Sequence, residues 1–219
     1  MEKFTPTQIE TVYQVIAARR DMRHFRSDPL DEALMARLLQ AAHCAPSVGY
    51  MQPWRFIRVR STELRSQMLS LVEAERLETA EALGERQREF LRLKVEGMRE
   101  CAEILVAALC DKREQHVFGR RTMPEMDLAS VACAIQNMWL AARVENVGMG
   151  WVSMFDPEAL RELLRMPQGS RPVAILCLGR VDEFYPRPML EAQNWRERVD
   201  LSTLVFDDYW RTDGNDAVD

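Results

Sequence analysis

The chain has 219 residues and a mass of 25.4 kDa, which suits one sizeable domain or a domain with arms. Hydrophobic residues make up 47% and charged residues 29%, a globular composition that excludes a disordered chain. The net charge of −5 argues against nucleic acid as a partner, and the apolar runs are too short to span a membrane. Of the 29 basic residues, 26 are arginines. Either codon usage explains this excess, or some arginines hold a planar or multiply charged anion.

The cysteines and histidines indicate a reduced protein without metal. The five cysteines are scattered and form no Cys-x-x-Cys pair, and most lie among apolar residues. Such thiols behave as small hydrophobes, which predicts a cytoplasmic protein. No charged-then-apolar leader opens the chain, so we expect no secretion. Because the three histidines lack ligand spacing, we also expect no metal.

Two helices and a strand are predicted in the first sixty residues. Thr5 and Gln8 match a capping box, and the apolar residues that follow recur on one helix face. These apolar residues are Ile9, Val12, Tyr13 and Ile16. A second helix is predicted from about Asp31 and stops before Pro46. The alternation over residues 54–60 predicts a strand.

Residues 73–100 are dense in Glu and Arg and have two interpretations. One is a solvated helix whose charges pair one turn apart. The other is a mobile lid, over residues 73–100, that covers a pocket.

The second half of the chain predicts the central elements of the fold. Residues 104–110 predict a buried strand, and residues 127–146 the most apolar helix. Since that helix is apolar around most of its circumference, we expect it at the centre or at a subunit interface. Gly148 is predicted to end it, and Asp156 to cap the next helix. Residues 173–179 predict the last strong strand.

The order of these elements predicts the fold class. Helices and strands mix without strict alternation, which indicates an α+β or mixed α/β fold with a central mixed sheet flanked by helices. We expect a single domain over residues 1–219 with a C-terminal arm over residues 180–219. Aromatic residues in that arm suggest that it packs on something, and a partner subunit is one candidate.

The first segment that could carry chemistry is Arg19-Arg20-Asp21-Met22-Arg23 at the end of the first helix. Three guanidinium groups this close repel each other unless they are solvated or bind an anion. Their bidentate geometry suits phosphate or the carbonyl edge of a heterocycle. The alternative is a solvated basic turn that Asp21 neutralises.

Two further segments could line a site. Ala45-Pro46-Ser47-Val48-Gly49-Tyr50-Met51-Gln52-Pro53-Trp54 places polar groups beside flat apolar ones. That chemistry suits an aromatic ring with a polar edge, although a structural loop is the alternative. In Gly148-Met149-Gly150-Trp151-Val152-Ser153 the glycines allow close backbone approach, and Ser153 could project into a site. A bulged strand explains this segment equally well.

Together, and in this order, the three segments resemble the nitroreductase-like flavoprotein superfamily over almost the whole chain. In that superfamily the basic turn binds the phosphate and pyrimidine edge of FMN. The Pro-Ser…Gln-Pro-Trp loop lies against the flavin, and the long helix builds a dimer. Asp21 stands where ordinary members carry Ser, and Tyr50 where they carry Asn. These departures, together with Ser153, resemble the 5,6-dimethylbenzimidazole synthases within the superfamily.

This narrower resemblance implies an activity that consumes the flavin. Reduced FMN (FMNH2) would react with O2 and be fragmented to 5,6-dimethylbenzimidazole, the lower ligand of cobalamin (vitamin B12), with release of erythrose 4-phosphate. It implies a homodimer, a separate flavin reductase that supplies FMNH2, and no metal. The main alternative is an NAD(P)H-dependent FMN nitroreductase or related flavin reductase, against which Asp21 and Tyr50 count. A non-catalytic flavin carrier is a third interpretation.

The resemblance also implies roles for individual residues. Arg19 and Arg20 would hold the phosphate, and Arg23 the pyrimidine edge. Asp21, wedged among arginines, should be ionised because nearby positive charge favours the carboxylate, and it is the expected general base. Ser153 would position the ring and ribityl chain or relay a proton. The other expected flavin contacts are Met22, Ser47, Met51, Gln52, Gly150, Trp151, Val152 and, by their order after the last strand, Arg196 and Arg198.

Overall fold

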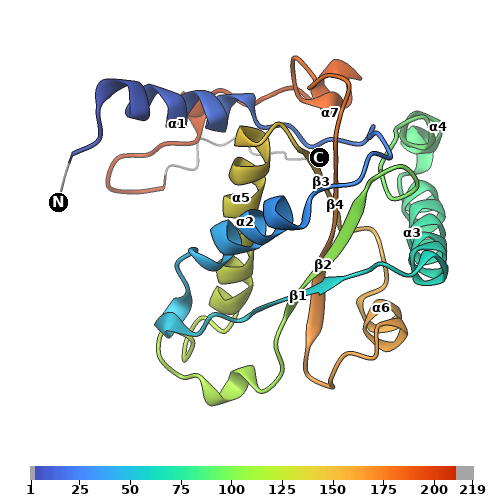
Figure 1. The fold of residues 1–219 in the computed structure, drawn as a ribbon, viewed down its shortest axis with the longest axis horizontal. Helices are drawn as coiled ribbons and strands as arrows, with labels where there is room; N and C mark the ends of the chain where they lie inside the picture. The colour runs from blue at the N-terminus through green and yellow to red at the C-terminus, as the bar shows by residue number, and fades with distance from the viewer. Residues whose placement is uncertain (1–2, 211–219) are drawn as a thin grey trace. The chain divides into compact units, whose positions relative to one another are not determined.

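The computed structural model describes residues 3–210 (Figure 1). The chain divides into two compact units, Met1–Pro186 and Arg187–Asp219. The helices of the first unit are α1 (Pro6–Ala18), α2 (Glu32–His43), α3 (Thr62–Ala82), α4 (Gln87–Leu91), α5 (Met126–Val144) and α6 (Pro157–Leu163). Its strands are β1 (Trp54–Arg58), β2 (Glu103–Leu109), β3 (Gly148–Val152) and β4 (Arg171–Gly179).

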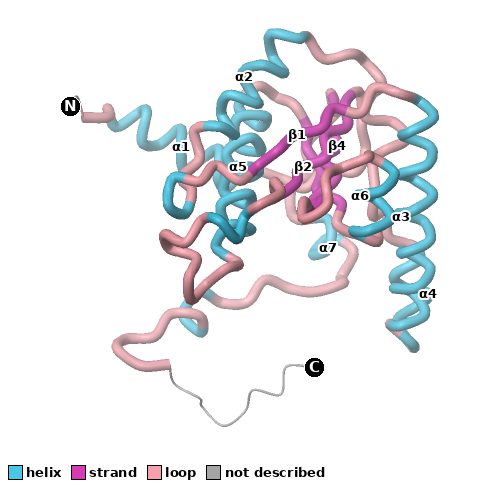
Figure 2. Tube along the Cα trace, turned by 90° about the horizontal axis from the view of Figure 1, so that it is seen from below, coloured by secondary structure: helices cyan, strands magenta, loops and turns pink. Residues whose placement is uncertain are grey.

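The sheet of the first unit lies between two layers of helices (Figures 1 and 2). Its strand order is β1-β2-β4-β3, so β2 and β4 are central and β3 is an edge strand. One buried cluster joins α2 and α5 to one face, and a second joins α3 and α6 to the other. β2 and β4 are buried on both faces, which agrees with the continuous apolar runs predicted for them.

The strand pairing differs in detail from the mixed sheet predicted from the sequence. Each of the three strand pairs is antiparallel. In the described part of the chain, the parallel component is one isolated bridge between Asp21 and Met149. This bridge brings the residues after α1 to the outer edge of β3.

The predicted helix starts are confirmed. Thr5 Oγ1 accepts the Gln8 N–H at 3.3 Å, and the Gln8 side chain accepts the Thr5 N–H at 2.8 Å. This reciprocal capping box fixes the start of α1. Asp156 caps α6 through the Ala159 N–H at 2.6 Å.

The predicted end of α5 needs a correction. Gly148 does not end the helix, because α5 ends at Val144 and Gly148 already belongs to β3. Asn146 takes the left-handed conformation instead, with φ of 54°. Gly148 has a different function, since a Cβ atom there would collide with Val181 Cγ1.

The apolar face predicted for α1 exists but is not buried within the described residues. Its members, Ile9, Val12, Tyr13 and Ile16, are all exposed. Three of them, Ile9, Val12 and Tyr13, help to line a hollow of about 480 Å³. An exposed apolar face of this kind marks an interaction surface.

Residues 73–100 carry the paired surface charges of the first interpretation, but part of the stretch is buried. Glu and Arg side chains three residues apart form ion pairs on the surface, such as Glu73 with Arg76 and Arg86 with Glu89. After α4, however, Leu93 and Met98 are buried. The lid function remains a prediction.

The second unit carries α7 (Met189–Ala192) and a short 3-10 turn at Leu201–Thr203. It makes up most of the arm predicted over residues 180–219, of which residues 211–219 lie outside the described residues. None of the helices between residues 3 and 210 is both long and apolar enough to cross a membrane.

Candidate functional site

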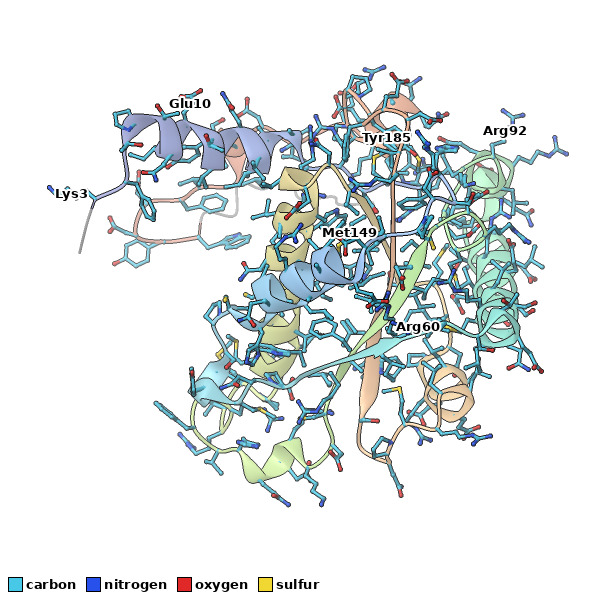
Figure 3. The ribbon with its side chains drawn as sticks, viewed as in Figure 1. Lys3, Glu10, Arg60, Arg92, Met149 and Tyr185 are labelled. Atoms are coloured by element: carbon cyan, nitrogen blue, oxygen red, sulfur yellow. The ribbon has the colours of Figure 1, made fainter. Side chains whose placement is uncertain are left out.

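The extended segment of residues 20–23 lies along the outer edge of β3. The Met22 N–H donates to the Met149 carbonyl oxygen at 3.0 Å, and Figure 3 labels Met149 on this strand. Trp139 of α5 fixes the start of the segment, since its Nε1–H donates to the Arg20 carbonyl oxygen at 3.1 Å. The segment is therefore held by elements more than a hundred residues away in the chain.

The carboxylate of Asp21 is oriented by its contacts with Trp151 and Arg23. Oδ1 accepts the Trp151 N–H at 3.1 Å, and Oδ2 accepts Nη2–H of Arg23 at 2.7 Å. The same Nη2 donates to the Trp151 carbonyl oxygen at 2.8 Å. Arg23 is itself buried, so Asp21, Arg23 and Trp151 form one fixed hydrogen-bonded group.

Gly150 makes this group possible. A Cβ atom on Gly150 would stand closer than 3.0 Å to both the Met22 carbonyl oxygen and Nη1 of Arg23. Only a residue without a side chain lets the segment approach β3 this closely. The close backbone approach predicted for this glycine is therefore an approach to residues of the chain itself.

The pKa of Asp21 is raised from its usual value of 3.8, and burial is the largest cause. The Arg23 guanidinium, the Trp151 N–H and Arg19 lower it, in that order of size, without cancelling the effect of burial. The desolvation comes from the closely packed surroundings, although 43% of the side-chain surface remains accessible. The neighbouring arginines thus favour the carboxylate, as expected from the sequence, but burial has the larger effect on this pKa.

A hollow of about 550 Å³ begins beside this group. Trp151 lines it, and Ser153, which is exposed, contributes a hydroxyl. Its other lining residues are Leu128, Ala132, Phe155, Pro157, Arg171, Pro172 and Val173. Its volume falls in the range of small-molecule sites, and its lining is mostly apolar with a few polar groups.

The two remaining arginines of the basic segment differ in their contacts. The Arg19 guanidinium carbon lies 4.6 Å from the centre of the Trp139 ring. Arg20 donates to the carbonyl oxygens of Ala17, Arg19, Tyr185 and Pro186. These bonds use four of its five N–H donors, which leaves one for the predicted phosphate contact.

Several predicted flavin contacts are placed in the core or in the second unit. The side chains of Met22 and Val152 are buried, so their predicted contacts would have to use backbone atoms. Arg196 and Arg198 are exposed residues of the second unit, and their phosphate contact remains a prediction. Between residues 3 and 210, no three His, Cys, Asp or Glu side chains are grouped as metal ligands.

The loop that follows α2 is folded by its own polar groups. Ser47 Oγ accepts the Gln52 N–H at 3.0 Å, and this bond closes the loop that contains Met51. Gly49, Tyr50 and Gln52 all have positive φ, so the backbone turns sharply here. Gly49 is further constrained because a Cβ there would collide with the Phe118 carbonyl oxygen.

This loop and the segment of residues 20–23 contact different ends of α5. The Val48 N–H donates to Ser130 Oγ, whereas the Arg20 carbonyl oxygen binds Trp139. About nine helical residues separate these two anchors, which corresponds to ~14 Å along the axis. Figure 1 shows the loop near one end of α5 and the segment near the other. One copy of the chain therefore does not bring the two predicted halves of the site together.

Sequence reasoning missed Arg171 and Tyr185. Arg171 lines the hollow at the start of β4, and the Tyr185 hydroxyl bonds to the segment of residues 20–23. No local motif marks either residue. Arg171 is identified by its place in the lining of the hollow, and Tyr185 by its hydrogen bond to Arg23.

Comparisons with known proteins find one matching family model, similar curated proteins and similar solved structures. A model of the Nitroreductase family matches residues 16–180. The chain is 41% identical over 198 residues to the 5,6-dimethylbenzimidazole synthase of Rhodospirillum rubrum, which covers 89% of this chain and 93% of that protein. It is 39% identical to the 5,6-dimethylbenzimidazole synthase of Rhodobacter capsulatus, which covers 90% of this chain and 96% of that protein. The crystal structure of iodotyrosine deiodinase bound to FMN and 3-iodo-L-tyrosine has the same fold, with a TM-score of 0.69 and 22% identity over 91% of this chain and 99% of that chain.

Proposed function

The chain belongs to the nitroreductase family, and from that premise we propose that it fragments reduced FMN with O2 to 5,6-dimethylbenzimidazole, the lower ligand of cobalamin. The second product would be erythrose 4-phosphate. The observation that carries the proposal is Asp21, a carboxylate with a raised pKa that is bound to Trp151, a residue that lines a hollow of ligand size. The two curated 5,6-dimethylbenzimidazole synthases at 41% and 39% identity support 5,6-dimethylbenzimidazole as the product.

The residues around the hollow fit a flavin. The mostly apolar lining suits the ring system, and the Ser153 hydroxyl and the Arg171 guanidinium suit its polar atoms. When bound, reduced FMN supplies the electrons that O2 takes up and the ring and ribityl atoms that become the two products. Arg19 and the remaining donor of Arg20 would hold the phosphate, helped by Arg196 and Arg198.

Asp21 would act as the general base. A pKa raised from the usual value of aspartate makes Asp21 a stronger base than an ordinary aspartate. Arg23 would bind the pyrimidine edge while it keeps Asp21 in place, and Ser153 would orient the ring and ribityl chain. Residues 73–100 would act as a lid that excludes water from the reaction.

FMNH2 would be consumed in each turnover, so a separate flavin reductase would have to supply it. A cytoplasmic location fits this supply and the five free cysteines.

We further propose that the active form is a homodimer. The exposed apolar face of α1 and the exposed Leu128 and Val144 of α5 offer a surface for a second copy. Antiparallel packing of two α5 helices would bring Ser47, Met51 and Gln52 of one copy near residues 20–23 of the other. The ~14 Å separation of these groups along one α5 helix supports this arrangement. Sedimentation analysis of the purified chain tests it.

The activity is tested by adding FMNH2 and air to the purified protein and analysing the products by mass spectrometry. We expect 5,6-dimethylbenzimidazole and erythrose 4-phosphate. Reoxidised FMN as the sole product would contradict the proposal. Steady NADH oxidation with a nitroaromatic or quinone would instead indicate a nitroreductase, and stably bound FMN without either activity would indicate a flavin carrier.

Arg19→Ala should weaken FMN binding by about 10- to 100-fold, because it removes a charge-assisted contact to the phosphate. The affinity can be measured from the quenching of FMN fluorescence. Arg60→Ala is a suitable control, since Arg60 is an exposed arginine that pairs with Glu32. Equal affinities for wild type and Arg19→Ala would exclude the phosphate contact.

The rate per bound flavin should fall as the pH falls through the pKa of Asp21. A base must be deprotonated, and the raised pKa moves this loss to a higher pH than for an ordinary aspartate. Arg23→Gln removes a charge that lowers the pKa, so the acid limb should move to still higher pH. Arg37→Gln, which breaks an exposed pair with Glu145, should leave the limb in place. An unshifted limb in Arg23→Gln would show that another group controls the rate.

A further inference from the structure

We propose that Tyr185 is a positioning residue, whose hydroxyl group holds the segment that carries Asp21. The inference rests on the proposed function, because the base that Tyr185 would position is Asp21. Tyr185 lies in the loop after β4, where Figure 3 labels it, and does not line the hollow.

The Tyr185 hydroxyl joins two neighbouring residues, Arg23 and His24. Its oxygen accepts the Arg23 backbone N–H at 3.2 Å. It also lies 2.6 Å from Nδ1 of His24, and the two rings meet edge to face with their centres 5.9 Å apart. Because the Arg23 N–H occupies one acceptor site of the oxygen, the hydroxyl hydrogen is available for Nδ1 of a neutral His24.

The backbone around Tyr185 binds the same segment. The Tyr185 carbonyl oxygen accepts Nε–H of Arg20 at 3.0 Å, and the Pro186 carbonyl oxygen accepts an Nη2–H of Arg20 at 3.0 Å. One residue before Tyr185, the Phe184 ring lies 4.0 Å from the guanidinium carbon of Arg143 on α5. The loop of residues 184–186 is thus tied both to α5 and to the basic segment.

The segment that carries Asp21 is therefore hydrogen-bonded on both of its sides, to β3 and to Tyr185. In an extended chain, successive N–H groups point to opposite sides. The Met22 N–H accordingly binds β3, and the Arg23 N–H binds Tyr185. The β3 side fixes the Asp21 carboxylate directly, and the Tyr185 side keeps the backbone of Arg23 against β3.

The rest of the segment has an independent anchor. A Cβ atom on Gly97 would collide with the Phe25 ring, and a Cβ on Gly179 would come within 3.2 Å of it. The Phe25 ring thus occupies space that is available because Gly97 and Gly179 have no side chains. For this reason, loss of the Tyr185 hydroxyl should loosen the segment locally without unfolding the protein.

Tyr185→Phe tests the proposal, because it removes the hydroxyl and keeps the ring. Without the hydroxyl the Arg23 N–H loses its partner, so amide exchange in a peptide covering residues 20–26 should become about tenfold faster. Hydrogen exchange read by mass spectrometry measures this without any flavin. The acid limb of product formation should move to lower pH, since a loosened segment exposes Asp21 and removes part of the burial that is the largest cause of its raised pKa.

Tyr209→Phe is the matched control, because Tyr209 is 81% exposed in the second unit. It should change neither exchange nor the pH profile. If Tyr185→Phe does not fold, His24→Ala, which leaves the Tyr185–Arg23 bond in place, should show smaller changes in the same direction. Wild-type exchange in residues 20–26, or an unshifted acid limb, would overturn the positioning function. If the wild type forms no 5,6-dimethylbenzimidazole, the proposed activity fails, and the exchange experiment still tests Tyr185.

Discussion

Asp21→Asn should lower the formation of 5,6-dimethylbenzimidazole by about 10²- to 10⁴-fold while FMN still binds. The amide has the size of the carboxylate and can still accept the Trp151 N–H, but it is no longer a base. Product formation under air, measured by mass spectrometry, and FMN affinity, measured by fluorescence titration, separate the two effects. A loss of product with near-normal affinity would identify Asp21 as the proton acceptor.

Asp28→Asn is the control for this experiment. Asp28 is 48% exposed, close to the 43% of Asp21, and it also pairs with an arginine two residues away. Because Asp28 has no place in the hydrogen-bonded group of Asp21, Arg23 and Trp151, this variant should have normal activity. Normal turnover by Asp21→Asn would exclude the base function, and complete loss of FMN binding would instead assign Asp21 a function in binding.

Gly150→Ala should destabilise the protein by about 3 kcal/mol and abolish flavin binding. The new methyl group would occupy the space of the Met22 carbonyl oxygen and the Arg23 guanidinium, and backbone atoms cannot move aside cheaply. The segment of residues 20–23 would therefore leave β3, and Asp21 would lose its contact with Trp151. Denaturant unfolding and FMN titration measure the two consequences.

Gly84→Ala provides the comparison. Its Cβ would meet nothing within 4 Å, so only the positive φ of 55° is unfavourable, at about 1 kcal/mol. If Gly150→Ala were as stable as Gly84→Ala and still bound FMN, the close approach of the segment to β3 would not be required.

The elements that could be predicted from the sequence depend on interactions within one turn or one strand. Thr5 and Gln8 bind each other across the first turn of α1, and the apolar run of β2 is buried wherever the strand lies in the sheet. The end of α5 was harder to predict, because Asn146 and Gly148 both allow a helix to end. Only the packing of β3 against Val181 shows that Gly148 is needed as a strand residue.

The residues of the basic segment could be predicted from the sequence, but the effect of burial on the pKa of Asp21 could not. The cluster of arginines around Asp21 is visible in the sequence, and it does lower the pKa of that residue. The larger effect of burial arises from the packing of Asp21 against β3, where its partner Trp151 is 130 residues away. Long-range bonds also explain Arg20, whose donors bind carbonyl oxygens at Tyr185 and Pro186 that no local pattern reveals.

The position of residues 20–23 along β3 has a consequence for solubility. An edge strand with free N–H and C=O groups can pair with a strand of another molecule and start aggregation. Here the Met149 carbonyl and both backbone polar groups of Trp151 are already bound, by Met22, Asp21 and Arg23. The segment that carries the proposed base therefore also blocks growth of the sheet at this edge, and substitutions that release it would favour aggregation as well as loss of activity.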